Sequence, residues 1–543
     1  MSKAFLPPFI FLSLITILVY SGLTQVFYQQ DEWQNIGNNI ILKNFTEIFD
    51  NLTPAKLLVA QDRFASILLS YIFFGKLSFN TSAIALYSIF FHTANSLLVF
   101  YLVRKWIIKN SLFASIGTLF FTISSVSHSA VSWFGTSLGT LVAVTLILSS
   151  LILYFNYLSN LKIKWLYVSL LTLYISLFFK EIGIFLFLLM PLGALLYNRL
   201  SWRDFFKKFW PFLFIFFSIA ITRLTWFLSV DRSSELFISS STTNNIPTII
   251  TRFFFYPLTS LSLTFIPQEL LINFAKFFTN IYYPLFPSEH FNIIVQTVVI
   301  DLFAVALTLI ILFIFYLAVR KESITIKKHA IFWVAFFVLS FLPYVLLSKS
   351  FAYLESRYYY LSNLPSGIIL GLTVFSLNKY LNRWRLGMVA IFLVGLFLVV
   401  HLKYLNKSLM DLIAVSQERR SLLSQLSRLK PTFDNNKNIF YITGNHDFYL
   451  VGNHVPFQQG MGYTLMIWYY QTGKIPSQLI KDKFLWNLNT EGYKEIASLG
   501  FGFFSDEHKL RQTIKDYHLT KNQVNALFYD FSSKELKKID LNL

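Results

Sequence analysis

Long apolar runs, separated by short polar and basic segments, occupy most of the first 404 residues. A helix needs about 17–25 such residues to cross the ~30 Å hydrocarbon core of a bilayer. The pattern therefore predicts a mainly α-helical, polytopic membrane protein with about eleven transmembrane helices. They are expected at residues 5–27, 84–103, 111–127, 135–157, 164–179, 182–198, 209–229, 294–319, 330–347, 361–378 and 386–404.

Two long segments between the expected spans, 28–83 and 230–293, have a different pattern. The first places Ile36, Ile40 and Phe45 at helical spacing, which is typical of an amphipathic helix lying in the membrane interface. A second apolar piece in that segment is a candidate to dip into the bilayer. The aromatic and proline-rich part of 230–293 predicts a pair of interfacial or re-entrant helices.

The composition changes at about residue 405, where the last span-length apolar run has ended. Residues 412–426 follow a helical pattern, and Ile439-Phe440-Tyr441-Ile442 is typical of a strand. The chain is thus expected to consist of a transmembrane domain, residues 1–404, and a small α/β domain, residues 405–543.

Composition supports the membrane assignment. Hydrophobic residues make up 55% of the 543 residues and charged residues only 13%, against about 45–50% and about 25% in an average soluble protein. The 46 Lys and Arg exceed the 27 Asp and Glu and give a net charge of +19. There is no cysteine, which excludes disulfides, thiol chemistry and cysteine-type zinc sites.

The position of the basic residues predicts an orientation. With a cytoplasmic N-terminus, the short inner segments hold 17 Lys and Arg in 44 residues, whereas the outer segments hold 10 in 142. Cytoplasmic loops carry such an excess. Both long segments and the C-terminal domain are then extracytoplasmic, and the positive charge does not imply nucleic acid. The lack of cysteine and the Lys/Asn/Ile/Phe-rich composition favour a bacterial plasma membrane over the endoplasmic reticulum.

Ionisable residues at the rim or depth of a membrane are costly and are candidates for function. Nine such residues stand out, and all but the fourth are expected on the outer face: Asp31, Glu32, Arg63, His92, His128, Lys180, Glu181, Glu355 and Arg357.

Each candidate also has an ordinary structural explanation. A carboxylate of Asp31-Glu32 can accept a proton from a hydroxyl nucleophile, or the acidic pair can favour the helix that follows. Arg357 can hold a phosphate by two parallel hydrogen bonds, while the adjacent run from Tyr358 suits an interfacial belt. Lys180-Glu181 can be a mutual ion pair. His92 is expected to be an interhelical hydrogen-bonding group.

One further motif is set aside. Gly444-Asn445-His446-Asp447 matches a run found in metallophosphoesterases. The upstream Asp-x-His and Gly-Asp-x-x-Asp motifs that would supply the other metal ligands do not occur in the chain. A two-metal site is therefore not expected here.

Four short motifs follow one another along the chain: Asp31-Glu32; Arg63, Gly75 and His92; Phe179-Lys180-Glu181-Ile182-Gly183; and Glu355-Ser356-Arg357-Tyr358-Tyr359-Tyr360. In this order they resemble motifs of the GT-C superfamily of polyprenyl-phosphate-dependent glycosyltransferases. The chain is most similar to bacterial relatives of protein O-mannosyltransferases and of tetratricopeptide-linked transmembrane O-mannosyltransferases. Phe64 stands where these families have proline, and Ser125-Val126-Ser127-His128 replaces a Pro-Val-His run. The tail lacks the repeat of about 34 residues that a tetratricopeptide array requires.

The resemblance implies a sugar transfer from a lipid-linked donor to an acceptor hydroxyl of a protein, lipid or glycan, with inversion. Asp31 is then the expected base, with Glu32 tuning it or positioning the acceptor. Arg357, with Arg63 or Lys180, would bind the donor phosphate, and Glu181, Glu355, His92, His128 and Tyr358 would support the site. Relatives differ in metal dependence, and no ligand cluster is visible, so no metal cofactor is expected.

Two other functions remain open from the residues alone. A lipid-linked saccharide transporter or flippase would need charges along a path through the bilayer and usually repeated halves, neither of which is evident. An O-antigen polymerase or ligase would share the substrate class and favour a large outer loop with arginine, but Asp31-Glu32 is less expected there.

Overall fold

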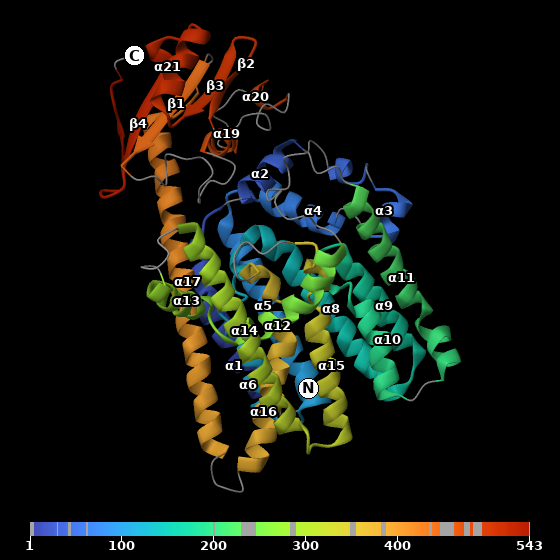
Figure 1. Ribbon diagram of the computed structural model, residues 1–543. Coiled ribbons are helices and arrows are strands. Elements are labelled where there is room, and N and C mark those ends of the chain that lie inside the picture. The colour runs from blue at the N-terminus through green and yellow to red at the C-terminus, as the bar shows by residue number, and fades with distance from the viewer. Residues whose placement is uncertain are drawn as a thin grey trace.

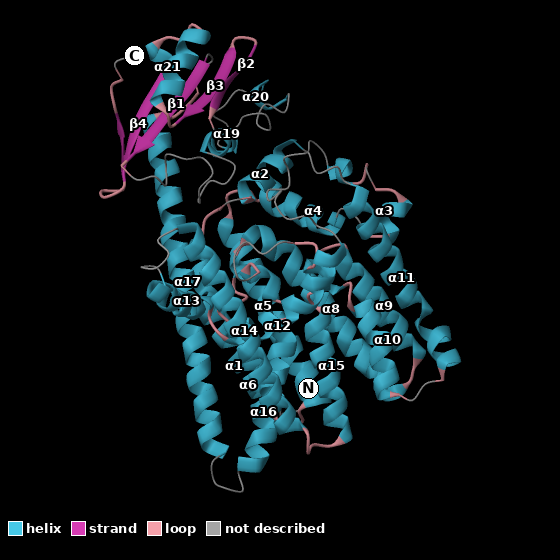
Figure 2. Cartoon of the chain, viewed as in Figure 1, coloured by secondary structure: helices cyan, strands magenta, loops and turns pink. Residues whose placement is uncertain are grey.

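The computed structural model describes the chain except for residues 1–4, 30, 42–44, 51, 61–62, 199–200, 230–245, 283–288, 348–353, 382–386, 434–436, 446–460, 472–477, 482–490 and 542–543. Helices dominate the described part, and a small sheet lies near the C-terminus (Figures 1 and 2). His446 and Asp447 of the Gly-Asn-His-Asp motif lie outside the described residues.

Eight helices among the described residues are long and apolar enough to cross a membrane. They are α1 (Leu6–Tyr20, continued by η1, Ser21–Gln25), α5 (Thr81–Leu102, continued by η5, Val103–Ile107), α8 (Phe134–Asn160), α11 (Trp202–Ser229), α14 (Glu289–Val319), α15 (Ile324–Leu339, followed by η7, Leu342–Tyr344), α16 (Asn363–Leu381) and α17 (Gly387–Leu429).

The expectation of eleven spans is therefore met for eight. The other three expected spans fall on shorter apolar helices, α6 (Ser111–Ile123), α9 (Ile163–Leu177), and α10 (Leu186–Tyr197), which follows η6 (Glu181–Gly183). At about 1.5 Å per residue, a helix of 12–15 residues is only about 18–22 Å long. None of these three reaches the full thickness of a hydrocarbon core by itself.

The first long segment forms short helices, and the described part of the second forms a bent pair of longer helices. The first contains α2 (Glu32–Ile41), η2 (Phe45–Ile48), α3 (Pro54–Leu58), α4 (Phe64–Ser70) and a π-helical turn η4 (Tyr71–Lys76). The described part of the second contains α12 (Ile246–Phe265) and α13 (Gln268–Tyr282), which are bent by 103° relative to each other.

Glycines bring α6 and α16 unusually close. A Cβ on Gly117 would lie 2.4 Å from the carbonyl oxygen of Gly367, and one on Gly371 would lie 3.0 Å from that of Phe113. Small residues allow such backbone contact between apolar helices. The contact matters for function because α6 leads into the segment before α8, while α16 follows η8 (Ser356–Tyr359), which carries Arg357. These two segments meet where Ser356 Oγ donates a hydrogen bond to the Val126 carbonyl, at 2.6 Å.

The small C-terminal sheet has the strand order β2-β3-β1-β4-β5. β1 (Lys437–Gly444) is central and parallel to β3 (Leu499–Phe504) and β4 (Val524–Asp530), and the edge strands β2 (Gly492–Ile496) and β5 (Glu535–Lys538) are antiparallel. Helices α19 (Met461–Gln471), α20 (Gln478–Lys481) and α21 (Glu507–Asp516) accompany it. The strand expected at 439–442 lies within β1.

The position of the C-terminal domain depends on α17. This helix runs unbroken through residue 404, where the sequence suggested a domain boundary, and ends at the sheet (Figure 1). The sheet and the helices α2, α3 and α4 lie at the same end of the bundle, whereas α14 and α16 finish at the opposite end (Figure 1).

Candidate functional site

The N-terminus of α8 is the point around which the predicted site residues gather. Trp133, the N-cap residue of α8, donates a hydrogen bond from its indole Nε1 to Asp31 Oδ1 at 3.0 Å. The guanidinium carbon of Arg357 lies 4.3 Å from the centre of a Trp133 ring, in a cation–π contact. One indole thus contacts both the expected base and the expected phosphate ligand.

Asp31 is only partly buried, and α2 begins at the next residue. Burial raises the pKa of Asp31, while the charge of Arg357 and the hydrogen bond from Trp133 oppose this shift. A partly exposed carboxylate with a raised pKa is a suitable proton acceptor.

Glu32, although adjacent in sequence, is placed differently. Its side chain is buried, and its two carboxylate oxygens accept hydrogen bonds from the backbone N–H groups of Gln29, at 2.7 Å, and Gly135, at 2.9 Å. Burial raises the pKa of Glu32 to about 8, and both N–H bonds act against this. Gly135 lies in the first turn of α8, where a carboxylate is also favoured by the helix dipole. Glu32 therefore joins the Asp31 segment to α8.

Arg357 is held on one side by aromatic rings. Besides Trp133, it contacts Tyr358, whose ring centre lies 5.2 Å from the guanidinium carbon. The Tyr358 ring packs in turn on the Tyr344 ring, with 4.8 Å between the ring centres. Arg357 Nη2 forms an ion pair with Glu355 at 2.7 Å. A guanidinium carries further N–H groups on Nε and Nη1, so this pairing does not exhaust its capacity to bind an anion.

Arg63 and Glu181 form the second charged cluster. Arg63, with a left-handed backbone φ of 44°, donates from Nε and Nη2 to the two carboxylate oxygens of Glu181, at 2.6 and 2.5 Å. This bidentate geometry is the strongest form of such a pair. The predicted mutual pairing of Lys180 with Glu181 is not what the geometry shows, because Glu181 pairs with Arg63 instead.

Lys180 points elsewhere, to α8. Its Nζ donates a hydrogen bond to Thr140 Oγ1 at 2.6 Å. Burial, and next the positive charge of Arg63, lower the pKa of Lys180 to about 7; Arg357 also lies near enough to contribute. The Lys180 ammonium group therefore lies within electrostatic range of both Arg63 and Arg357.

The first two turns of α8 contact Glu32, Lys180 and the segments that carry Arg63 and Glu181. A Cβ at Gly139 would lie 2.8 Å from Ser66 Oγ and 2.9 Å from the Phe179 carbonyl oxygen, so glycine permits α4 and the Lys180 segment to approach α8. Trp133 and Gly139 were not among the predicted site residues. Their importance depends on partners distant in sequence, which no pattern along the chain predicts.

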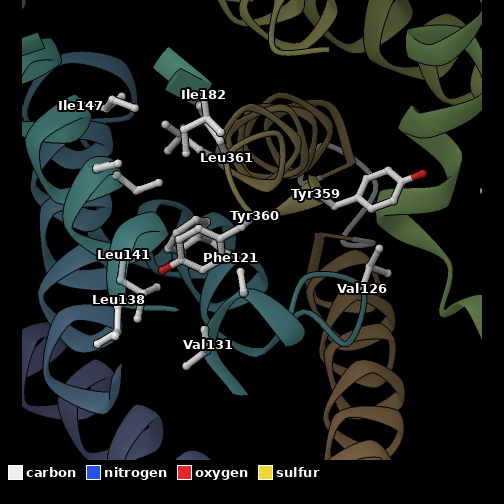
Figure 3. Close-up of a cluster of buried hydrophobic side chains, with 14 of the residues drawn as sticks. Phe121, Val126, Val131, Leu138, Leu141, Ile147, Ile182, Tyr359, Tyr360 and Leu361 are labelled. Atoms are coloured by element: carbon white, nitrogen blue, oxygen red, sulfur yellow. The ribbon is translucent and has the colours of Figure 1, made fainter. Parts of the chain in front are cut away.

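The two histidines lie in supporting positions. His92 is buried in α5, with Nδ1 2.7 Å from the Tyr360 hydroxyl and Nε2 3.0 Å from the Thr122 carbonyl oxygen. Tyr360 packs with Phe121 in the apolar cluster beside Leu141 (Figure 3). His128 Nδ1 lies 2.8 Å from the Ser125 carbonyl oxygen, and burial lowers the pKa of His128. Both histidines hold helices and turns together.

An apolar cavity of about 230 Å³ lies between α12, α14, α15 and α16. Its lining includes Phe253, Pro257, Leu312 and Phe337, with Thr308 as a polar member. After α15, which lines this cavity, the chain continues into η7 and Tyr344, whose ring packs on Tyr358 beside Arg357. Within the described residues, no three His, Cys, Asp or Glu side chains are grouped as metal ligands.

Comparison with known proteins adds no family to this description. No protein-family model matches the chain, and no curated protein matches it. The function must therefore be inferred from the site.

Proposed function

We propose that this protein is a membrane glycosyltransferase, similar to the GT-C superfamily, which transfers a sugar from a polyprenyl-phosphate donor to an acceptor hydroxyl. The observation that carries the proposal is the contact of Asp31 and Arg357 with the same indole, that of Trp133. A proton acceptor and an anion-binding cation are thereby held close together without a direct ion pair between them among the described contacts.

The reaction needs both groups. In a single displacement, the acceptor oxygen forms a bond to the anomeric carbon as the bond from that carbon to the phosphate oxygen breaks. The acceptor proton passes to Asp31, and the electron pair leaves with the phosphate. A base activates the hydroxyl, and cations stabilise the charge on the departing phosphate. The anomeric configuration is inverted because the attack is from the opposite face.

Arg357 is the preferred phosphate ligand, and Lys180 is the second. With a pKa of about 7, Lys180 is only partly protonated near neutral pH. The single negative charge of an incoming donor phosphodiester, and the greater charge of the departing polyprenyl phosphate, would favour the charged form and draw a proton onto Nζ. Arg63 is a weaker candidate because its Nε and Nη2 already donate hydrogen bonds to the two carboxylate oxygens of Glu181.

The surroundings suit a lipid-linked substrate. The cavity bounded by Phe253 and Phe337 offers an apolar environment between membrane helices, and one of them, α15, leads into the turn that carries Tyr344. The ends of α14 and α16 that precede the basic segments lie opposite the site (Figure 1). By the positive-inside rule the site would then face the outer side of a bacterial plasma membrane, with a protein, lipid or glycan as acceptor.

The test is transfer of a radiolabelled sugar from polyprenyl phosphate in vesicles containing the purified protein. Wild type should transfer the label to an acceptor hydroxyl, whereas Asp31→Asn and Arg357→Ala should be strongly impaired. Label that crosses the membrane while remaining on its lipid would instead favour a transporter. Undiminished transfer by Asp31→Asn would contradict the assignment of the base.

A further inference from the structure

The backbone segment that leads to Asp31 packs against the part of α17 that extends toward the sheet. Ser416 Oγ lies 3.4 Å from the Phe27 carbonyl oxygen, and Arg419 Nη1 donates to the Tyr28 carbonyl at 3.4 Å. Both side chains belong to the helix that also carries the C-terminal sheet. The segment therefore has a second support besides α8.

Arg419 lies in the same buried region as Glu32. Their residues are only 2% and 1% exposed, and the charge of Arg419 favours the ionised form of Glu32. Removing this positive charge makes the ionised form of the buried acid less favourable. Arg419 therefore stabilises the Glu32 carboxylate. That carboxylate binds the N–H groups of Gln29, two residues before Asp31, and of Gly135, two residues after Trp133.

Neighbouring residues of the C-terminal domain strengthen this support. Arg420 donates to Thr81 Oγ1 at 3.1 Å and lies over the Phe27 ring, 5.1 Å from its centre. On α19, Trp468 packs edge-on against Phe79 at 5.2 Å, and its Nε1 donates to Ser427 Oγ of α17 at 2.7 Å. Trp468 also packs edge-on against Phe27, with 6.4 Å between the ring centres, so α17 and α19 both contact the segment that leads to Asp31.

We propose that Arg419 is a positioning residue, which acts through Glu32 and the Tyr28 carbonyl to hold Asp31 against Trp133. The C-terminal domain thereby contributes to the geometry of the site through α17, in addition to any contact with the acceptor. The role in catalysis rests on the proposed glycosyl transfer, but the role in fixing the segment does not.

The kinetic test compares Arg419→Met, which keeps the length and apolar stem but removes the charge, with Arg428→Met, an exposed arginine on the same helix. A displacement of a catalytic group by about 1 Å can cost about 100-fold in rate. We therefore expect kcat of Arg419→Met to fall about 100-fold with little change in the KM for donor, and Arg428→Met to match wild type. Arg419→Lys, which keeps the charge but not the planar geometry, should restore part of kcat.

A second readout needs no activity. The chain has no cysteine, so Ile36→Cys, one turn after Glu32 in α2 and fully buried, places a single thiol in the full-length protein. Its labelling by a maleimide should be slow alone and with Arg428→Met, and at least about tenfold faster with Arg419→Met, because labelling follows the population of opened states.

The outcomes separate the two proposals. If Arg419→Met labels faster but even the wild-type protein transfers no sugar, the positioning role is supported and the proposed function is contradicted. Wild-type kcat and wild-type labelling in Arg419→Met would overturn the positioning role. If Arg419→Met does not fold, Arg419→Lys decides: reduced kcat at unchanged KM is expected, and wild-type values of kcat and labelling would overturn the proposal.

Discussion

Two charged clusters flank the first turns of α8, and they differ in how their charges are neutralised. In one, Trp133 lies between Asp31 and Arg357: its indole N–H donates a hydrogen bond to Asp31, and its ring contacts the guanidinium of Arg357. In the other, Arg63 and Glu181 bind each other directly through two hydrogen bonds.

This difference indicates which cluster is built for a ligand. A bidentate pair satisfies both partners, so a phosphate approaching Arg63 would have to compete with Glu181. In the other cluster the Trp133 ring orients the Arg357 guanidinium, whose Nη2 pairs with Glu355 while Nε and Nη1 still carry N–H groups for an anion. One indole N–H likewise leaves most of the hydrogen-bonding capacity of Asp31 available. Under the proposed function, the Asp31–Trp133–Arg357 cluster is the reacting site, and Arg63–Glu181 is its support.

The largest expected difference between the clusters lies in their acids. A general base contributes about 10²–10⁴-fold to a rate, so Asp31→Asn should reduce the turnover of lipid-linked donor by about 1000-fold. Glu181→Gln should reduce it about tenfold or less, by disturbing Arg63. Asp50→Asn, an exposed acid of the same long segment, is the control and should match wild type. Equal losses in the first two variants would remove the distinction between the clusters.

The two arginines should differ next. Arg357→Ala removes a cation that stabilises the leaving phosphate, and loss of one such group costs about 100-fold or more in kcat. Arg63→Ala should lower kcat less and should lower the midpoint of thermal unfolding more, because Glu181 loses its partner. Steady-state kinetics and thermal denaturation in detergent measure both. A larger fall of kcat in Arg63→Ala would reverse the assigned roles.

Glu32→Gln should lower kcat less than Asp31→Asn, because it loosens the segment that carries Asp31 without removing the base, and it should have a clear effect on stability. One side-chain oxygen of glutamine can still accept a hydrogen bond, but its amide group cannot accept the second, so one buried backbone N–H loses its partner. This costs about 2 kcal/mol, and the midpoint of thermal unfolding should fall. An unchanged midpoint with a loss of transfer as large as that of Asp31→Asn would make Glu32 a catalytic group instead of an anchor.

The sequence was most informative where a residue type is costly in its setting. Apolar runs predicted the eight long helices, and isolated charges predicted Asp31, Arg63, Lys180 and Arg357, which the fold gathers at one end of the bundle. Short helices such as α6 were expected to span because apolar runs do not show where a helix ends.

Long-range partners were the part that sequence patterns could not supply. Trp133 is one of 11 tryptophans, and nothing in its neighbours predicts that it contacts both Asp31 and Arg357. The helical pattern around Arg419 was recognised, but the change of composition at residue 405 concealed that α17 is one continuous helix. That Asp31 is partly exposed while Glu32 is buried likewise depends on the fold, because the two acids are adjacent in sequence and no pattern distinguishes them.

The measurement that tests the central claim most directly is the pH dependence of single-turnover transfer in wild type and Trp133→Phe. Asp31 must be deprotonated to act as a base, so the rate should fall as pH falls through its raised pKa. Phenylalanine keeps a ring beneath Arg357 but removes the N–H whose hydrogen bond lowers that pKa. The acid limb of the profile should therefore move to higher pH in Trp133→Phe. A limb that stays in place or moves to lower pH would contradict the claim that Asp31, held by Trp133, is the base.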